Sequence, residues 1–352
     1  MEFAFTDEQA MIAETARAFF SENATSERTR LAMAGDGIDR RLWTAFCQEL
    51  GLSGIGIPES AGGAGLGLVE LAIIAEAAGA QVAALPMLGS LAMAAQALAA
   101  GGSAEQQAEW LPRLLSGEVI AGYVHDAGLK ADGNVLTGAD QFVAHGAAAQ
   151  VFVITSNTGA WVIPADANGL TVTAQTTMDQ TRPYASVTLS GAVAAPLVDA
   201  ASAIAAAQRA GFVTVAAEAL GGAQAALDRT VGYAKERVQF GRAIGSFQAY
   251  KHRLADMMIE IEQARSAVYW AACAVEEGSD EAELAVHSAK CFAADTYFMC
   301  AGNMIQLHGG IGFTWEHDAH LYFKRARALQ SMLGSGNWHR ERIASMILGD
   351  AA

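Results

Sequence analysis

The chain has 352 residues, of which 52% are apolar and 17% are charged, and its formal net charge is −15 at pH 7. This composition is typical of a soluble globular protein that buries a large core and has room for two or three domains. The acidic charge argues against nucleic acid and anionic lipid as partners, because both surfaces are themselves negative, and favours a small molecule or another protein.

Hydrophobic periodicity changes along the chain and predicts its domains. Over residues 1–117 apolar residues recur at helical spacing, as in Leu68, Leu71 and Ile74, which predicts an N-terminal helical domain. Over residues 118–199 short alternating runs rich in β-branched residues are separated by Gly, Asn and Asp turns, which predicts a small β domain.

Helical periodicity returns over residues 200–352 and predicts a four-helix bundle. The expected helices are Ala203–Arg237, Phe247–Gly278, Asp280–Gln306 and a last one after Trp338. Ser279-Asp280 supports the third helix, since an N-cap residue is followed there by acids that face the positive helix end. The fold class is therefore mainly α with a small central β domain.

Several sequence features predict what the protein lacks. The four cysteines stand in apolar, helix-like surroundings without a CxxC spacing, which favours buried free thiols; they are Cys47, Cys273, Cys291 and Cys300. The stretch from His317 to His320 offers no third ligand, so no metal is expected. Met1-Glu2-Phe3 opens no basic-then-apolar leader, and no uninterrupted apolar run is long enough for a bilayer, so we expect a cytoplasmic protein.

Two segments of the C-terminal part carry groups suited to a dinucleotide. Residues 237–248 read Arg-Val-Gln-Phe-Gly-Arg-Ala-Ile-Gly-Ser-Phe-Gln, and the glycine segment (residues 306–312) reads Gln-Leu-His-Gly-Gly-Ile-Gly. The first combines a guanidinium with aromatic and amide side chains, and the second bares backbone amides. Together they predict a site for the pyrophosphate and adenine of a flavin dinucleotide.

With these segments in this order of domains, nearly the whole chain resembles the acyl-CoA dehydrogenase family. The N-terminal resemblance rests on Leu52 to Pro58-Glu59, on Gly62-Gly63-Ala64-Gly65 and on Glu76 with Gly79; we expect Gly62 to Gly67 to form an interhelical turn rather than a nucleotide loop. The C-terminal resemblance rests on the two segments and on Gly312-Phe313-Thr314. The ending from Gly309 to Asp318 resembles subunits of heteromeric dehydrogenases of steroid side-chain breakdown.

The resemblance implies that FAD lies between two subunits and that the segment from Arg237 to Gln248 reaches the neighbour's cofactor. Arg237 would pair with the pyrophosphate, and Phe240 would pack on the dinucleotide. The implied cofactor-binding residues are Arg237, Gln239, Phe240, Phe247, Gln248, Gln306, Gly309 and Gly310. The alternative is that Arg237 only closes a helix favourably and that Gln248 is a solvated amide.

The family's reaction removes an α-proton from an acyl-CoA thioester and transfers a hydride from the β-carbon to the flavin, so a carboxylate base in an apolar pocket is required. Both family positions for that base lack a carboxylate here, since Leu333 occupies one and Gly211 the other. Glu218 lies two turns along the same helix as Gly211 and is a weak candidate. A lone glutamate in an Ala-rich helix is more often solvated or ion-paired, so the catalytic residue stays unassigned.

The β domain departs from the family as well. The family's Thr-Glu-Pro segment corresponds to His125-Asp126-Ala127-Gly128, after which the chain is shortened. The ring-contacting Trp and Thr correspond to Phe142 and Ala144. Because the lost hydroxyls remove hydrogen bonds to the flavin ring, this domain is not expected to carry its own flavin.

The favoured hypothesis is a subunit of a heteromeric (α2β2) acyl-CoA dehydrogenase. It would contribute Arg237, Gln248 and Gln306 to an FAD site shared with a second dehydrogenase-like subunit, which supplies the base. The substrate would be an acyl-CoA, with a steroid side-chain thioester as one candidate, and an electron-transfer flavoprotein or similar carrier would accept the electrons. The alternatives are an autonomous homo-oligomeric dehydrogenase that uses Glu218, and a cofactor-free scaffold.

Overall fold

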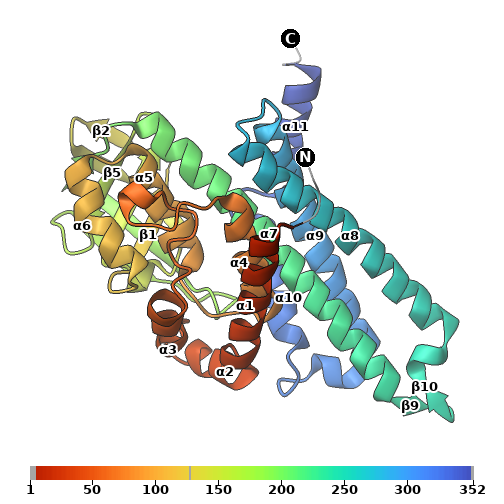
Figure 1. Ribbon diagram of the computed structural model, residues 1–352. Helices are drawn as coiled ribbons and strands as arrows, with labels where there is room; N and C mark the ends of the chain where they lie inside the picture. Colours follow the sequence, from red (N-terminus) through yellow and green to blue (C-terminus); the bar gives the residue numbers. More distant parts are fainter. Residues whose placement is uncertain (1–4, 127, 350–352) are drawn as a thin grey trace. The chain divides into compact units, whose positions relative to one another are not determined.

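The computed structural model describes residues 5–126 and 128–349 (Figure 1). Their internal contacts divide the chain into two compact units. The first unit contains residues 5–26, 72–83 and 212–349 of the described chain, and the second contains residues 27–71 and 84–211. The predicted fold class is confirmed, whereas the three-domain division at residues 117 and 199 stays a prediction.

The N-terminal part is helical, as its periodicity predicts. Its helices are α1 (Asp7–Asn23), α2 (Ser26–Met33), α3 (Arg40–Thr44), η1 (Ala45–Glu49), η2 (Glu59–Ala61), α4 (Leu68–Ala80), η3 (Leu88–Ala95), α5 (Gln96–Gly101) and α6 (Ala104–Leu115). Capping boxes built on Thr6 and Ser103 start α1 and α6. Between η2 and α4 the chain turns tightly, since a Cβ on Gly63 would meet the Ile57 carbonyl oxygen at 2.1 Å. This is the interhelical turn that the glycine run predicts.

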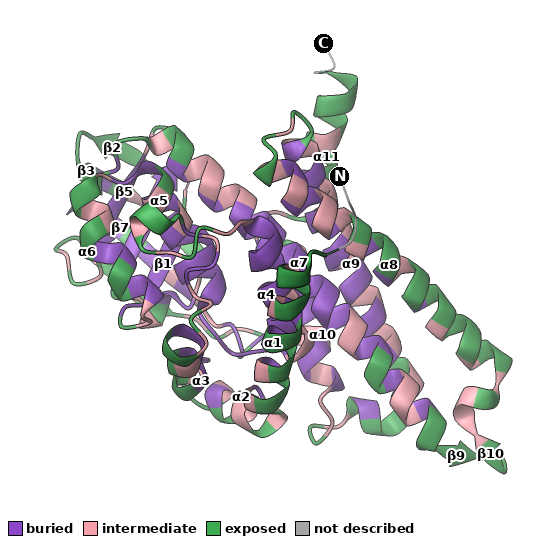
Figure 2. Cartoon of the chain, viewed as in Figure 1, coloured by how far each residue is buried: buried purple, intermediate pink, exposed green. Residues whose placement is uncertain are grey.

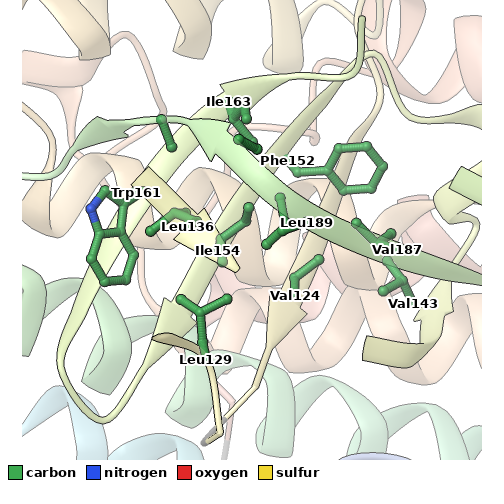
Figure 3. Packing of buried hydrophobic residues seen from close by; sticks show 12 residues of the cluster. Val124, Leu129, Leu136, Val143, Phe152, Ile154, Trp161, Ile163, Val187 and Leu189 are labelled. Atoms are coloured by element: carbon green, nitrogen blue, oxygen red, sulfur yellow. The ribbon is translucent and has the colours of Figure 1, made fainter. Parts of the chain in front are cut away.

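The β region consists of two four-stranded sheets. The first has the order β1 (Ala121–His125), β4 (Val151–Ser156), β5 (Gly159–Pro164) and β8 (Ala195–Pro196). The second has the order β2 (Lys130–Asp132), β3 (Val135–Ala144), β7 (Tyr184–Val193) and β6 (Leu170–Ala174). Strands β1 and β4 are parallel, and the other pairs are antiparallel. Alternate side chains of both sheets, among them Phe152, Trp161 and Leu189, form one buried apolar cluster (Figure 3).

The C-terminal part is built from long helices, which are α7 (Ala200–Glu236), α8 (Gln248–Glu276), α9 (Ala282–His308), α10 (Ala319–Ser331) and α11 (Gly336–Leu348), with the 3-10 turns η5 (Ile244–Ser246) and η6 (Gly309–Phe313). Helix α9 packs against α8, α10 and α11 (Figure 1). The predicted ranges identify α7, α8 and α9 to within a few residues. They omit α10, and α11 begins at Gly336 rather than after Trp338.

Backbone packing fixes the centre of the first unit. A Cβ on Gly221 of α7 would meet the Glu76 carbonyl oxygen of α4 at 1.9 Å, and a Cβ on Gly79 would meet the Glu218 carbonyl oxygen at 2.1 Å. Helices α4 and α7 therefore cross at a distance that only glycine permits. Helix α7 is long and apolar enough to span a membrane by length and composition, but 94% of its most apolar window is buried, as in a core helix.

Candidate functional site

Residues 237–248 form the hairpin segment, a two-stranded turn between α7 and α8. Strands β9 (Val238–Gln239) and β10 (Arg242–Ala243) pair antiparallel across the dipeptide Phe240-Gly241. Both turn residues have positive φ, +54° and +77°, which matches the two-residue turn whose twist suits a hairpin. The Ile244 N–H donates to the Arg237 carbonyl at 2.8 Å and closes the base of the hairpin.

The residues of β9 and of the turn after it are exposed (Figure 2). The Phe240 ring is 90% exposed and meets the Phe247 ring edge to face, with 6.1 Å between centroids. The Arg242 guanidinium lies 4.0 Å from the Phe247 centroid, a cation–π contact. Arg237 is exposed and forms no ion pair with any carboxylate of residues 5–126 or 128–349. Its guanidinium is therefore available to an anion.

The glycine segment lies beside the start of α8. Helix α9 ends at His308, and Gly309 has φ +64° and ψ −143°, a conformation essentially restricted to glycine. Gln306 is exposed in the last turn of α9, while Gln248 is exposed at the first position of α8. The Tyr250 hydroxyl donates to the Leu307 carbonyl at 2.9 Å and ties these two helix ends together. The structure thus brings the two segments to one end of the helices.

Buried aromatic contacts support this end of the unit. The Tyr233 ring of α7 stacks on His308 with 4.5 Å between centroids. The His308 Nδ1 donates to the Met304 carbonyl at 2.7 Å, and burial lowers the pKa of His308. His317 lies 4.5 Å from His308, centroid to centroid, and its Nδ1 accepts from the Ala319 N–H at 3.1 Å. Within the described residues no group of three His, Cys, Asp or Glu side chains could hold a metal ion.

These residues fit a flavin dinucleotide in chemistry and in access. A guanidinium without a carboxylate partner suits a pyrophosphate, and the amides of Gln239, Gln248 and Gln306 are exposed donors and acceptors for an adenosine. A Cβ built on Gly309 or Gly310 meets no atom within 4 Å, so the backbone there is open to close approach.

The two positions at which the resemblance implies a catalytic base, 333 and 211, carry no carboxylate. Leu333 follows α10 with φ +55°, and Gly334 follows with φ +103°. The Leu333 carbonyl accepts from His339 Nε2 at 3.1 Å, and the Gly334 carbonyl accepts from Lys290. Gly211 is buried within α7 and has no side chain to offer.

Glu218 is buried and ion-paired with Arg325 of α10. The Glu218 side chain is 3% exposed and the Arg325 side chain is 1% exposed. Both charges are withdrawn from water, so the carboxylate is held by its counter-charge. This is the interhelical ion pair that the sequence offers as the structural alternative to catalysis.

One polar cluster has no role in the sequence-based interpretation. The Arg265 guanidinium of α8 donates to one Glu76 oxygen at 2.6 Å, and the Tyr269 hydroxyl donates to the other at 2.6 Å. Burial, followed by the Glu76 charge, raises the pKa of Tyr269. Arg265 also donates to the side-chain amide oxygen Oε1 of Gln224 at 2.9 Å. Arg265 and Tyr269 are one turn apart on α8, but Glu76 and Gln224 lie 189 and 41 residues from Arg265, so no local spacing indicates the cluster.

The β region carries the other departures from the family. His125 Nδ1 lies 3.1 Å from the Thr155 hydroxyl, and burial lowers the pKa of His125. Asp140 accepts from the N–H groups of His125 and Phe142, and burial raises the pKa of its carboxyl group. Phe142 is exposed and Ala144 is half-buried, and neither carries a hydroxyl. Ala127 lies outside the described residues, as do Met1, Glu2 and Phe3.

Comparisons with known proteins agree with this architecture. Residues 6–118 match the N-terminal domain of acyl-CoA dehydrogenases, and residues 209–348 match the C-terminal domain. Acyl-CoA dehydrogenase IpdE2 of Mycolicibacterium smegmatis is 35% identical over 350 residues, covering 97% of this chain and 99% of that protein. IpdE2 of Mycobacterium tuberculosis is 36% identical over 343 residues, covering 97% and 98%.

Two solved structures are similar over the whole length. The ChsE4-ChsE5 complex from Mycobacterium tuberculosis contains a chain with a TM-score of 0.92 and 30% identity, covering all of both chains. A variant of the Tcur3481-Tcur3483 steroid ACAD contains one with a TM-score of 0.90 and 31% identity, covering 97% of this chain and 98% of that one. With both family domains matched and relatives aligned along nearly its full length, the chain belongs to the acyl-CoA dehydrogenase family of flavin-dependent oxidoreductases.

Proposed function

We propose that this chain is a subunit of a heteromeric acyl-CoA dehydrogenase and contributes part of an FAD site that it shares with a second dehydrogenase-like subunit. One observation carries the proposal. The groups that hold a dinucleotide are exposed, with Arg237 unclaimed by any carboxylate of the described chain, while Leu333 and Gly211 leave both base positions without a carboxylate. A site that retains binding groups and lacks the base is expected of a subunit that completes another subunit's active centre.

The residues of this chain act on the cofactor rather than on the substrate. Arg237 neutralises pyrophosphate charge, and Gln248 and Gln306 hydrogen-bond the adenosine half. Phe240 and Phe247 pack against the dinucleotide and exclude water from it. FAD, when bound, accepts the hydride that leaves the β-carbon of the substrate. The partner subunit supplies the carboxylate that removes the α-proton.

The substrate is an acyl-CoA thioester, and a steroid side-chain thioester is the class that we propose. Support comes from the similarity to a steroid ACAD and to a two-component complex. Loss of a second active site also frees volume for a bulky acyl group. An electron-transfer flavoprotein or similar carrier accepts the electrons, and the complex, an α2β2 heterotetramer, works in the cytoplasm.

Purification tests the proposal. The chain is expressed alone and together with a longer dehydrogenase-like homologue from an adjacent reading frame, one that retains the glutamate and the Thr-Glu-Pro segment. We expect flavin and dehydrogenase activity only in the co-purified complex. Bound yellow cofactor and turnover in the chain alone would overturn the proposal.

Substitution of Arg237 separates this function from a cofactor-free scaffold. Arg237→Ala removes a charge-assisted contact with the pyrophosphate, so flavin retention in the complex should weaken by about 1–3 kcal/mol, or roughly 5- to 150-fold. Arg253→Ala, at an exposed position of α8, is the matched control and should leave retention unchanged. Equal flavin retention in both variants would favour the scaffold.

A further inference from the structure

The C-terminal helix α11 docks through a histidine. Among residues 336–348, His339 has the one buried side chain. Its ring lies 5.0 Å from that of Phe212 in α7 and 4.9 Å from that of His287 in α9, centroid to centroid. Arg340 adds an exposed ion pair with Asp295 of α9, and such pairs contribute little. Trp338 of α11, 37% exposed, adds ring contacts with Phe212 and His287. The buried part of the α11 contact is therefore the His339 imidazole.

Hydrogen bonds fix the protonation of this imidazole. His339 Nε2 lies 3.1 Å from the Leu333 carbonyl oxygen, which can only accept, so Nε2 carries a proton. His339 Nδ1 lies 2.7 Å from His287 Nδ1. In the neutral pair His339 must accept at Nδ1 and His287 must donate. The bonds run in one direction, from His287 through His339 to Leu333.

The surroundings of the pair disfavour added charge. Burial lowers the pKa of His339 to about 3, and the charge of Lys290 and then His287 contribute in the same direction. Burial also lowers the pKa of His287, where Glu283 of α9 favours the cation and Arg342 of α11 opposes it. Phe212 presents an apolar ring to both histidines.

Lys290 holds the turn that precedes α11. It is fully buried and donates to the carbonyls of Gly334 and Gln330. Burial lowers the pKa of Lys290 to about 8, so it is mostly protonated at neutral pH and adds positive charge beside the pair. Cys291 and Asp295 on the same helix act in the opposite direction on Lys290. Cationic side chains therefore lie near the pair on both helices, Lys290 on α9 and Arg342 on α11.

We propose that the His287–His339 pair is a proton-sensitive latch, which holds α11 and the Leu333–Gly334 turn against α9 while both imidazoles are neutral and releases them on acidification. A third proton on the pair places a charge in a buried site that already faces Lys290. A fourth proton points two N–H groups at each other across 2.7 Å. Released histidines accept both added protons without either penalty.

The sign and the pH window follow from these protonation states. A released histidine titrates near pH 6.5, whereas the docked histidines titrate lower. The docked state is therefore fully favoured above pH 6.5 and loses that advantage as the pH falls toward the docked value of about 3. For each proton that only the released state takes up, the docking equilibrium shifts by up to about tenfold per pH unit.

Hydrogen exchange on the full-length chain tests the latch. Backbone exchange of residues 336–348 is measured at pH 7.5 and pH 5.5 and corrected for intrinsic exchange rates. We expect protection to fall about tenfold or more at pH 5.5, because roughly one full pH unit lies below the titration of a released histidine. Equal protection at both pH values overturns the proposal.

Three variants identify the groups responsible. His287→Gln/His339→Gln removes both titrating rings and keeps amide donors. Protection of residues 336–348 in this variant should therefore be equal at pH 7.5 and pH 5.5. Arg340→Gln breaks the ion pair between the same helices and should show the same fall in protection between pH 7.5 and pH 5.5 as the unmodified chain. If residues 336–348 of the double variant are unprotected at both pH values, the single variant His287→Gln is measured instead, because His339 keeps its hydrogen bond to Leu333 there. A smaller fall in protection between pH 7.5 and pH 5.5 in that variant supports the latch, and an unchanged fall overturns it.

Discussion

Replacing Glu218 by glutamine tests whether this carboxylate is structural or catalytic. The substitution removes the Glu218 charge from beside the buried, charged Arg325, because the two side chains are 3% and 1% exposed in the folded protein. Breaking a buried ion pair by removing one partner costs about 3–5 kcal/mol. Since the glutamine oxygen still accepts one hydrogen bond, we expect the lower end, about 3 kcal/mol of unfolding free energy.

The assay is urea denaturation of the purified chain, with two comparison variants. Glu236→Gln removes an exposed glutamate from the same helix and should change stability by less than about 0.5 kcal/mol. Glu218→Leu/Arg325→Met removes both charges and keeps apolar volume, so it should recover most of the stability that Glu218→Gln loses.

Activity gives the second half of the test. In the assembled enzyme, Glu218→Gln should keep its turnover per folded complex, because the ion pair only supports packing between α7 and α10. The reasoning is refuted if Glu218→Gln is as stable as the unmodified protein and inactive. That result would identify Glu218 as the base and would favour the autonomous enzyme.

Three further predictions concern packing, backbone and thiols. Gly221→Ala should cost about 1–3 kcal/mol in urea denaturation because its Cβ has no room beside α4, whereas Gly232→Ala on the same helix meets no neighbour within 4 Å and should gain about 0.5–1 kcal/mol. Gly241→Val places a β-branched residue at φ +77° and should speed proteolysis of the hairpin while α7 and α8 stay protected. Cys273 is half-buried and should react first with a thiol reagent at pH 8, whereas Cys47 should stay unreacted, because burial raises its pKa to about 12.

The sequence predicts features that depend on neighbours along the chain. Helices α7, α8 and α9 follow from apolar periodicity in Ala-rich segments. The hairpin is found only in the structure, because Phe240 is an atypical residue for a turn position with positive φ. Helix α10 escapes this reasoning because Arg325 occupies its buried face and interrupts the apolar pattern. Its partner Glu218 lies 107 residues away, so only the folded chain shows that a charge there is compensated.

At position 333, where the family resemblance implies a base, the backbone conformation does not depend on the side chain that is present. Leu333 adopts a left-handed conformation that costs a non-glycine residue of order 1–3 kcal/mol, and the turn is held by Lys290 and His339 from two helices. The side chain at position 333 supplies none of these hydrogen bonds. Exchanging leucine for a carboxylate therefore changes the chemistry while the backbone that presents it is fixed from outside. The hairpin differs from this turn, because it has both its backbone hydrogen bonds and a charged group, the exposed Arg237 guanidinium. Under the proposed function, a chain with this combination binds cofactor without abstracting a proton, so its activity is to be tested in a complex.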